Sequence, residues 1–72
     1  KKMIKIFDVD NHLVEEGQKV RIVSDIPTTN GMIYKDSIMK VSKIIENKKI
    51  RVVDNLGKIW YIKSSDISVK YL

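Results

Sequence analysis

The sequence predicts a small all-β domain, and three observations carry this prediction. Short runs of β-branched residues alternate apolar with polar positions, which is the pattern of half-buried strands. Turn-forming Gly, Asn and Asp residues interrupt these runs about every 8 to 12 residues. The chain has 72 residues and no cysteine, so a single apolar core without disulfide bonds must hold it together.

The N-terminal third predicts two strands and a turn between them. The first strand is expected over residues 3–7, with Ile4 and Ile6 in the core. The letters DVDNH at 8–12 predict an acidic turn, so that residues 3–16 form an N-terminal strand and its turn. The second strand is expected over residues 19–23.

The middle of the chain predicts a long loop and then a long strand. Residues 24–31 carry the only proline and an Asn-Gly pair, and are expected to be irregular. A short strand follows at 32–34 and a longer one at 38–45. A helix over 36–49 is the alternative, capped by Asp36 or Ser37, but Val, Ile and Ser form helices poorly and strands flank the segment.

The C-terminal third predicts a hairpin whose two faces can be assigned. Strands are expected over 50–54 and 58–63, and Gly57 is expected in the left-handed conformation that closes the turn. The resulting pairs are Asp54 with Lys58, Val52 with Trp60, and Ile50 with Ile62. The core face then holds Ile50, Val52, Trp60 and Ile62. The opposite face holds Lys49, Arg51, Val53, Ile59, Tyr61 and Lys63. A 3₁₀ turn over 64–67 and a last strand over 68–72 complete the prediction.

This order of elements resembles that of SH3-like barrels. The segments EGQKVRIV, NGMIYKDSIMKVSKI, KIRVVDNLGKIWYI and SSDI correspond to the successive strands, the distal hairpin and the 3₁₀ turn. Residues 17–44 also resemble a KOW-type module, since GQKVRI is followed by a glycine before the next strand. The resemblance covers about residues 16–72 and implies a small closed barrel of five to six strands with one 3₁₀ turn before the last strand. The length of the chain leaves room for one domain, over residues 1–72. An OB-like barrel is the alternative.

The charge of the chain is uneven. The net charge is +5, but residues 1–16 have a balance of −1 and the remaining residues a balance of +6. A basic body favours nucleic acid or an acidic protein surface as the partner. A genome-wide preference for lysine and isoleucine codons is the alternative source of this charge, since the chain holds twelve of each.

The outer face of the predicted hairpin is the candidate binding site. Tyr61 is expected opposite Arg51, and an aromatic ring among cations is typical of surfaces that bind nucleic acid. A cross-strand pair that only stabilises the sheet is the alternative. The candidate nucleic-acid-binding residues are Arg51, Tyr61, Lys49, Lys63, Arg21 and Lys43.

Catalysis is not expected. The letters FDVDNHLV resemble the first motif of haloacid-dehalogenase-type phosphatases, but Asn11 and His12 depart from that motif. A strand-rich chain of this length has no room for the helices and sheet of that family. A metal site built from Asp8, Asp10, His12 and either Glu15 or Glu16 has too few ligands. The sequence therefore predicts no enzyme activity, no cofactor and no metal.

The predicted function is that of a non-catalytic binding module, associated with nucleic acid through the basic and aromatic sheet face. The alternative is a protein-interaction module encoded by a bacterial phage or mobile element. It would act as an adaptor or would inhibit a factor of the host. Such a module would receive its partner in a groove between the 24–36 loop and the 46–49 turn. Lys5 interrupts the first apolar run, and no run approaches the roughly 18 residues of a membrane span, so we expect a cytoplasmic protein without membrane contact.

Overall fold

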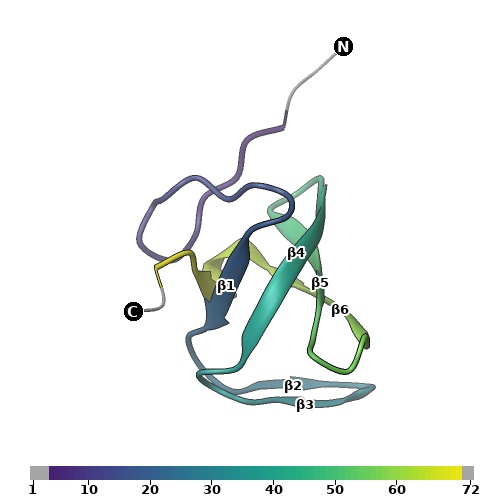
Figure 1. The fold of residues 1–72 in the computed structure, drawn as a ribbon. Helices are drawn as coiled ribbons and strands as arrows, with labels where there is room; N and C mark the ends of the chain where they lie inside the picture. Colours follow the sequence, from purple (N-terminus) through teal and green to yellow (C-terminus); the bar gives the residue numbers. More distant parts are fainter. Residues whose placement is uncertain (1–3, 71–72) are drawn as a thin grey trace.

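The computed structural model describes residues 4–70 and shows an antiparallel sheet of five strands with a separate two-stranded hairpin (Figure 1). The order of strands in the sheet is β6-β5-β4-β1-β7, and the hairpin is β2-β3. The elements are β1 Lys19–Ile22, β2 Ile26–Thr28, β3 Gly31–Ile33, β4 Ile38–Ile45, β5 Lys49–Val53, β6 Ile59–Lys63, the 3₁₀ turn η1 Ser64–Asp66, and β7 Ile67–Ser68.

One apolar core lies on the inner face of the sheet. Alternate residues of β1, β4, β5 and β6 point into it, as the two-residue period of a strand requires. Two residues of the N-terminal segment, Ile6 and Val14, close the core from outside the sheet, and the N–H of Val14 donates to the carbonyl of Ile6 at 3.0 Å. The buried apolar residues are Ile6, Val14, Val20, Ile22, Ile33, Met39, Val41, Ile50, Val52, Trp60, Ile62 and Ile67.

The predictions for the central strands are confirmed. β4 covers residues 38–45, so the alternative helix over 36–49 is wrong. The β5-β6 hairpin has the predicted register, with Val52 opposite Trp60 and Ile50 opposite Ile62. Gly57 has a φ of +82°, and Trp60 is 8% exposed. The all-β class is confirmed as well.

The predicted ends of the chain need correction. Residues 4–6 form no strand, and Phe7 makes only an isolated bridge with Leu13. Ile4, expected in the core, is exposed because no neighbouring strand covers it. In place of the predicted last strand over 68–72, the structure has the short strand β7 at Ile67–Ser68, and residues 69–70 are not part of a strand. Met3, Tyr71 and Leu72 lie outside the described residues.

The predicted loop over 24–31 contains structure of its own. Ile26 pairs with Ile33 and Thr28 with Gly31, which makes the β2-β3 hairpin and raises the number of strands from the expected five or six to seven. The loop places its hairpin against the β5-β6 turn, where the Nζ of Lys58 donates to the carbonyl of Asn30 at 2.8 Å (Figure 1).

The sheet is open. β6 and β7 lie at its opposite ends and η1 joins them, but the two strands do not pair, so the predicted closed barrel is not found. Both end strands therefore keep one edge without a hydrogen-bonded neighbour in the sheet. Over residues 4–70, no helix has the length and apolar character needed to cross a membrane.

Candidate functional site

A β-bulge in β4 decides which side chains reach the outer face of the sheet. Val41 pairs with Val52 and Lys43 with Arg51, so Ser42 is an additional residue in β4. Strict alternation from the buried Val41 would turn Lys43 inward, whereas the bulge turns it outward. The bulge thus lets β4 carry a lysine at this point without placing a charge in the core.

One row of side chains crosses three strands on this outer face. Lys43 of β4 lies opposite Arg51 of β5, which lies opposite Tyr61 of β6. The N–H of Asp54 donates to the carbonyl of Lys58 at 3.0 Å, and antiparallel pairs alternate along the ladder, so Arg51 and Tyr61 form a non-hydrogen-bonded pair. Side chains of such pairs stand closer together than those of hydrogen-bonded pairs, so the side chains of Arg51 and Tyr61 are neighbours on the outer face.

A second row lies next to the first, with Lys49 opposite Lys63. We call the surface formed by the two rows the basic face, and it consists of Lys43, Lys49, Arg51, Tyr61 and Lys63. Tyr61 is 62% exposed. Among residues 4–70 the ion pairs join His12 with Asp8 and Arg21 with Asp36, so no carboxylate pairs with the cations of the basic face.

Ser42 fixes the position of Arg51. The Nε of Arg51 donates to the Ser42 Oγ at 2.9 Å, and this hydroxyl donates to the carbonyl of Arg51 at 3.1 Å. The arginine is therefore held through Nε, and its two terminal amino groups have no hydrogen bond within the described part of the chain. Terminal guanidinium groups of this kind bind carboxylate or phosphate in a two-pronged manner.

Two hollows flank Tyr61. The first, which we call the sheet hollow, extends from Tyr61 over β5 and β4; its lining is Ile4, Lys43, Ile44, Ile45, Glu46, Arg51 and Tyr61. The second, the hairpin hollow, extends from Tyr61 toward β2-β3; its lining is Thr28, Thr29, Asn30, Ile59, Trp60 and Tyr61. Tyr61 is the residue that the two hollows share.

Arg21 does not join the other five candidate residues. It lies on β1 between Ile38 and Ser68, and β4 separates β1 from β5. Its Nη1 pairs with the Asp36 carboxylate at 3.1 Å. This ion pair offsets the charge of Arg21, so the structure brings together Lys43, Lys49, Arg51, Tyr61 and Lys63 and leaves Arg21 apart.

Asp8 holds the predicted acidic turn together. Its Oδ1 accepts the N–H groups of Asp10 at 2.9 Å and His12 at 2.8 Å, and its Oδ2 accepts the N–H of Val69 at 2.8 Å. Burial raises the pKa of this carboxyl, but the three N–H donors and the nearby His12 ring outweigh burial, so the pKa lies below its ordinary value. Asp8 therefore connects the N-terminal segment to the chain beyond β7.

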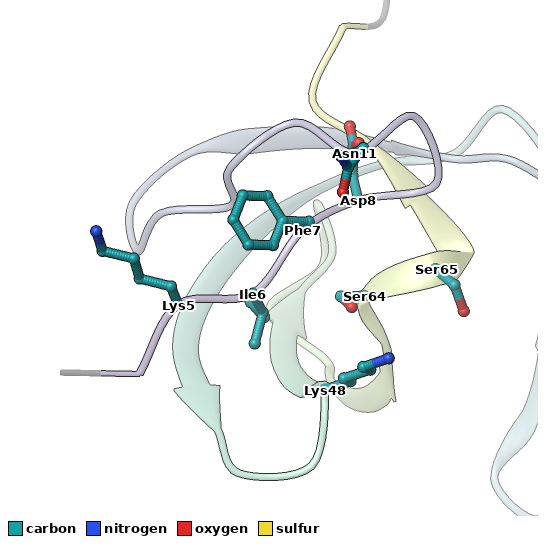
Figure 2. A pocket seen from close by; sticks show the side chains of 8 residues that line it. All are labelled: Lys5, Ile6, Phe7, Asp8, Asn11, Lys48, Ser64 and Ser65. Carbon is teal, nitrogen blue, oxygen red and sulfur yellow. The ribbon is translucent and has the colours of Figure 1, made fainter. Parts of the chain in front are cut away.

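A small pocket lies beside this turn (Figure 2), and its lining is Lys5, Ile6, Phe7, Asp8, Asn11, Lys48, Ser64 and Ser65. In Figure 2, Lys5 extends away from Ser64 and Ser65. Asp8 contributes a carboxylate to this pocket, so the pocket is less favourable to anions than the basic face.

The structure places Asp8, Asp10 and His12 together, with one ligand atom of each within 4.8 Å of the others. The Asp8 oxygens already accept N–H groups, and the His12 Nδ1 lies 3.7 Å from Asp8 Oδ1 without a hydrogen bond. Of the two glutamates expected to complete the set, Glu15 and Glu16, the second is used elsewhere, because the Glu16 Oε2 accepts the N–H of Ile44 at 3.0 Å. The hydrogen bonds of the turn thus account for the position of the Asp8 carboxylate.

Asp54 plays a matching part in the β5-β6 hairpin, and sequence reasoning missed it. Its Oδ1 accepts the N–H groups of Leu56 and Lys58 at 2.9 Å, and its Oδ2 accepts the Trp60 Nε1 at 3.1 Å. The hydrogen bond from the Trp60 ring is the main cause that lowers the pKa of Asp54. Lys58 Nζ lies 4.2 Å from the centre of the Trp60 ring. The signal for this role was an aspartate directly before the Asn-Leu-Gly turn.

Comparison of the chain with protein-family models, with curated proteins and with solved structures finds no match in any of the three.

Proposed function

We propose that this protein is a non-catalytic module that binds nucleic acid through the basic face. The observation that carries the proposal is the row Lys43-Arg51-Tyr61, in which an exposed aromatic ring on β6 lies opposite one cation on β5, with a second cation on β4 beyond it. Lys49 and Lys63 extend the positive charge along the same strands.

The chemistry of these groups suits a phosphate backbone with bases. Ammonium and guanidinium groups neutralise phosphates and release bound counterions, while a tyrosine ring offers a flat surface for a base. The four cations of the basic face lack carboxylate partners in the described chain, so they need not break an ion pair before they bind. Arg51 is in addition oriented by Ser42 before any ligand arrives.

Fluorescence anisotropy with labelled oligonucleotides across a series of salt concentrations tests the proposal. We expect the affinity to fall steeply with salt, and the slope of log K against log salt to decrease by about 0.7 to 0.9 for each cation removed. The variants Lys49→Ala, Arg51→Ala and Lys63→Ala serve for this series. Lys35→Ala, an exposed lysine outside the basic face, is the matched control and leaves the slope unchanged. Absence of binding at about 50 mM salt would overturn the proposal.

A protein-interaction module is the second candidate, and the open edge of β6 favours it. In the β5-β6 ladder the N–H and C=O groups of Ile59 and Tyr61 point away from β5, because both residues lie in non-hydrogen-bonded pairs. An extended peptide, acidic to match the basic face, would add a strand at this edge. The protein would then act as an adaptor, or as an inhibitor encoded by a phage or mobile element. Binding of an acidic peptide by a chain that binds no oligonucleotide would favour this candidate.

We also infer that the architecture is related to SH3-like barrels. The support is the sheet order, the loop with its own hairpin between β1 and β4, and the 3₁₀ turn between β6 and β7. We propose the cytoplasm as the location, where nucleic acids and their partners are accessible.

A further inference from the structure

We propose that the basic face prefers single-stranded to duplex nucleic acid, and that the ring of Tyr61 lies between two unpaired bases, one in the sheet hollow and one in the hairpin hollow. This inference rests on the proposed function and names the class of nucleic acid that the face takes. Its starting point is the place of Tyr61, which is the one lining residue common to the two hollows.

Tyr61 is exposed for a structural reason. Its neighbours Trp60 and Ile62 point into the core, so the two-residue period of β6 turns Tyr61 outward. β6 is an end strand, so no further strand of the sheet stands beyond Tyr61. The ring is thus accessible from the β5 side and from the β2-β3 side, as a platform for two stacked bases requires.

The sheet hollow offers an apolar floor with a cationic rim. Ile4 and Ile45 supply apolar surface beside Lys43 and Arg51, whereas Ile44 packs partly against the core. A base stacked on Tyr61 here would have its attached phosphate within reach of the guanidinium, whose terminal amino groups are free. Glu46 is the one acid that lines this hollow, and a base amino group is the part of a nucleotide that pairs with it.

The hairpin hollow offers hydrogen-bonding groups in place of charge. The Thr28 hydroxyl is occupied, since it donates to the carbonyl of Gly31 at 2.6 Å and accepts the N–H of Asn30 at 3.0 Å. The side chains of Thr29 and Asn30 remain free in the described chain, next to the open backbone groups of Ile59 and Tyr61. Such donors and acceptors fit the Watson–Crick edge of a base, which a duplex conceals and a single strand exposes.

The difference between the hollows gives a direction to the bound strand. Lys43 and Arg51 line the sheet hollow, whereas the cation beside the hairpin hollow, Lys58, is engaged by the Asn30 carbonyl and the Trp60 ring. The phosphates should therefore follow β4 and β5, while the bases turn toward β6. In a duplex both faces of each base are stacked on neighbouring pairs, so Tyr61 would contribute little and only the cations would bind.

The experiment compares a labelled oligothymidine of about 12 nucleotides with a duplex of equal length, by fluorescence anisotropy at one salt concentration. We expect the single strand to bind at least about tenfold more tightly than the duplex. Tyr61→Ala should weaken single-strand binding about 10- to 100-fold and leave duplex binding unchanged within about twofold, and Tyr61→Phe should retain single-strand binding because the ring remains. Tyr34→Ala is the matched control, because Tyr34 is 64% exposed but lies outside both hollows.

The outcomes separate this inference from the proposed function. Equal affinity for the two oligonucleotides, or a Tyr61→Ala variant that binds the single strand like the wild type while Arg51→Ala does not, overturns base stacking but keeps nucleic-acid binding. Failure of both oligonucleotides to bind, or binding of an acidic peptide alone, overturns both. Thermal unfolding followed by the fluorescence of Trp60, the single tryptophan, verifies that each variant is folded.

Discussion

The basic face and the acidic turn at residues 8–12 differ in whether their charged groups have partners within the protein. In the acidic turn the residue Asp8 is 6% exposed, and its carboxylate accepts three backbone N–H groups. In the basic face Lys43, Lys49 and Lys63 are exposed and form no ion pair within residues 4–70. The charge of Asp8 is used within the protein, whereas the charge of the basic face remains available to a partner.

This difference separates stability from binding. A carboxylate that satisfies buried or half-buried N–H groups contributes to folding, and its removal leaves those donors without an acceptor. Exposed cations contribute little to folding but attract phosphate. Substitutions in the turn should therefore change the free energy of unfolding, and substitutions in the face should change affinity.

The largest expected effect on stability comes from Asp8→Ala. Three N–H groups lose their acceptor and the N-terminal segment loses its hydrogen bond to Val69, so we expect a loss of about 2 to 4 kcal/mol in the free energy of unfolding. Urea unfolding followed by Trp60 fluorescence measures it. Asp8→Asn keeps one oxygen acceptor and should lose less. An unfolding free energy for Asp8→Ala equal to that of the wild type would contradict the structural role of the turn.

Acid should remove part of the same stabilisation. The pKa of Asp8 is lower in the folded protein than its ordinary value of 3.8, so the folded state favours the charged form. The stabilisation is complete above the unfolded pKa and is lost as the pH falls through the folded pKa. Urea unfolding at a series of pH values from about 7 to 2 should therefore show a decrease confined to the range below about pH 4. Asp54 shifts in the same direction, so Asp8→Asn should reduce this decrease without abolishing it.

Gly57→Ala tests the turn that presents the basic face. Gly57 has a φ of +82° and no atom within 4 Å of the position of an added Cβ, so the cost is one of backbone conformation alone. We expect a loss of about 1 kcal/mol, measured as a shift in the urea midpoint. Gly57→Asn should cost less, since asparagine tolerates this conformation better than alanine. Equal losses for the two variants would show that the backbone conformation is not the cause.

Ser42→Ala should have the smallest effect on stability and a visible effect on binding. It removes the hydroxyl that holds the Arg51 Nε, at a cost of about 0.5 to 1 kcal/mol. Arg51 keeps its charge but loses its orientation, so we expect oligonucleotide affinity to fall about 2- to 5-fold with an unchanged salt slope. Ser42→Thr retains the hydroxyl and serves as the control. A reduced salt slope for Ser42→Ala would contradict a purely orienting role.

The sequence predicted the parts of the fold that depend on local patterns. The two faces of the β5-β6 hairpin followed from alternation and from the left-handed glycine, and the structure reproduces them. The outward position of both Lys40 and Lys43 did not follow from alternation, because they are an odd number of residues apart. The additional residue Ser42 in the bulge lets both lysines point outward, and no single residue type marks a bulge of this kind in a sequence.

Contacts between distant segments were not predictable from local patterns. The first apolar run looks like a strand, yet it packs Ile6 into the core and relies on Asp8, which bonds to a residue 61 positions away. The open sheet likewise depends on whether β6 and β7 meet, which alternation does not determine. The ion pair that offsets the charge of Arg21 joins it to Asp36, and the loop between these two residues has a path that the sequence pattern does not determine.

Mapping of backbone amide chemical shifts during titration with a single-stranded oligonucleotide tests the central claim most directly. We predict the largest shifts in β4 from Ser42 onward, in β5 and in β6, at the residues of the basic face and its neighbours, and shifts near zero over residues 8–12. The shifts should disappear as salt is raised. Shifts concentrated in residues 8–12, or no shifts at low salt, would contradict the claim that the basic face is the binding surface.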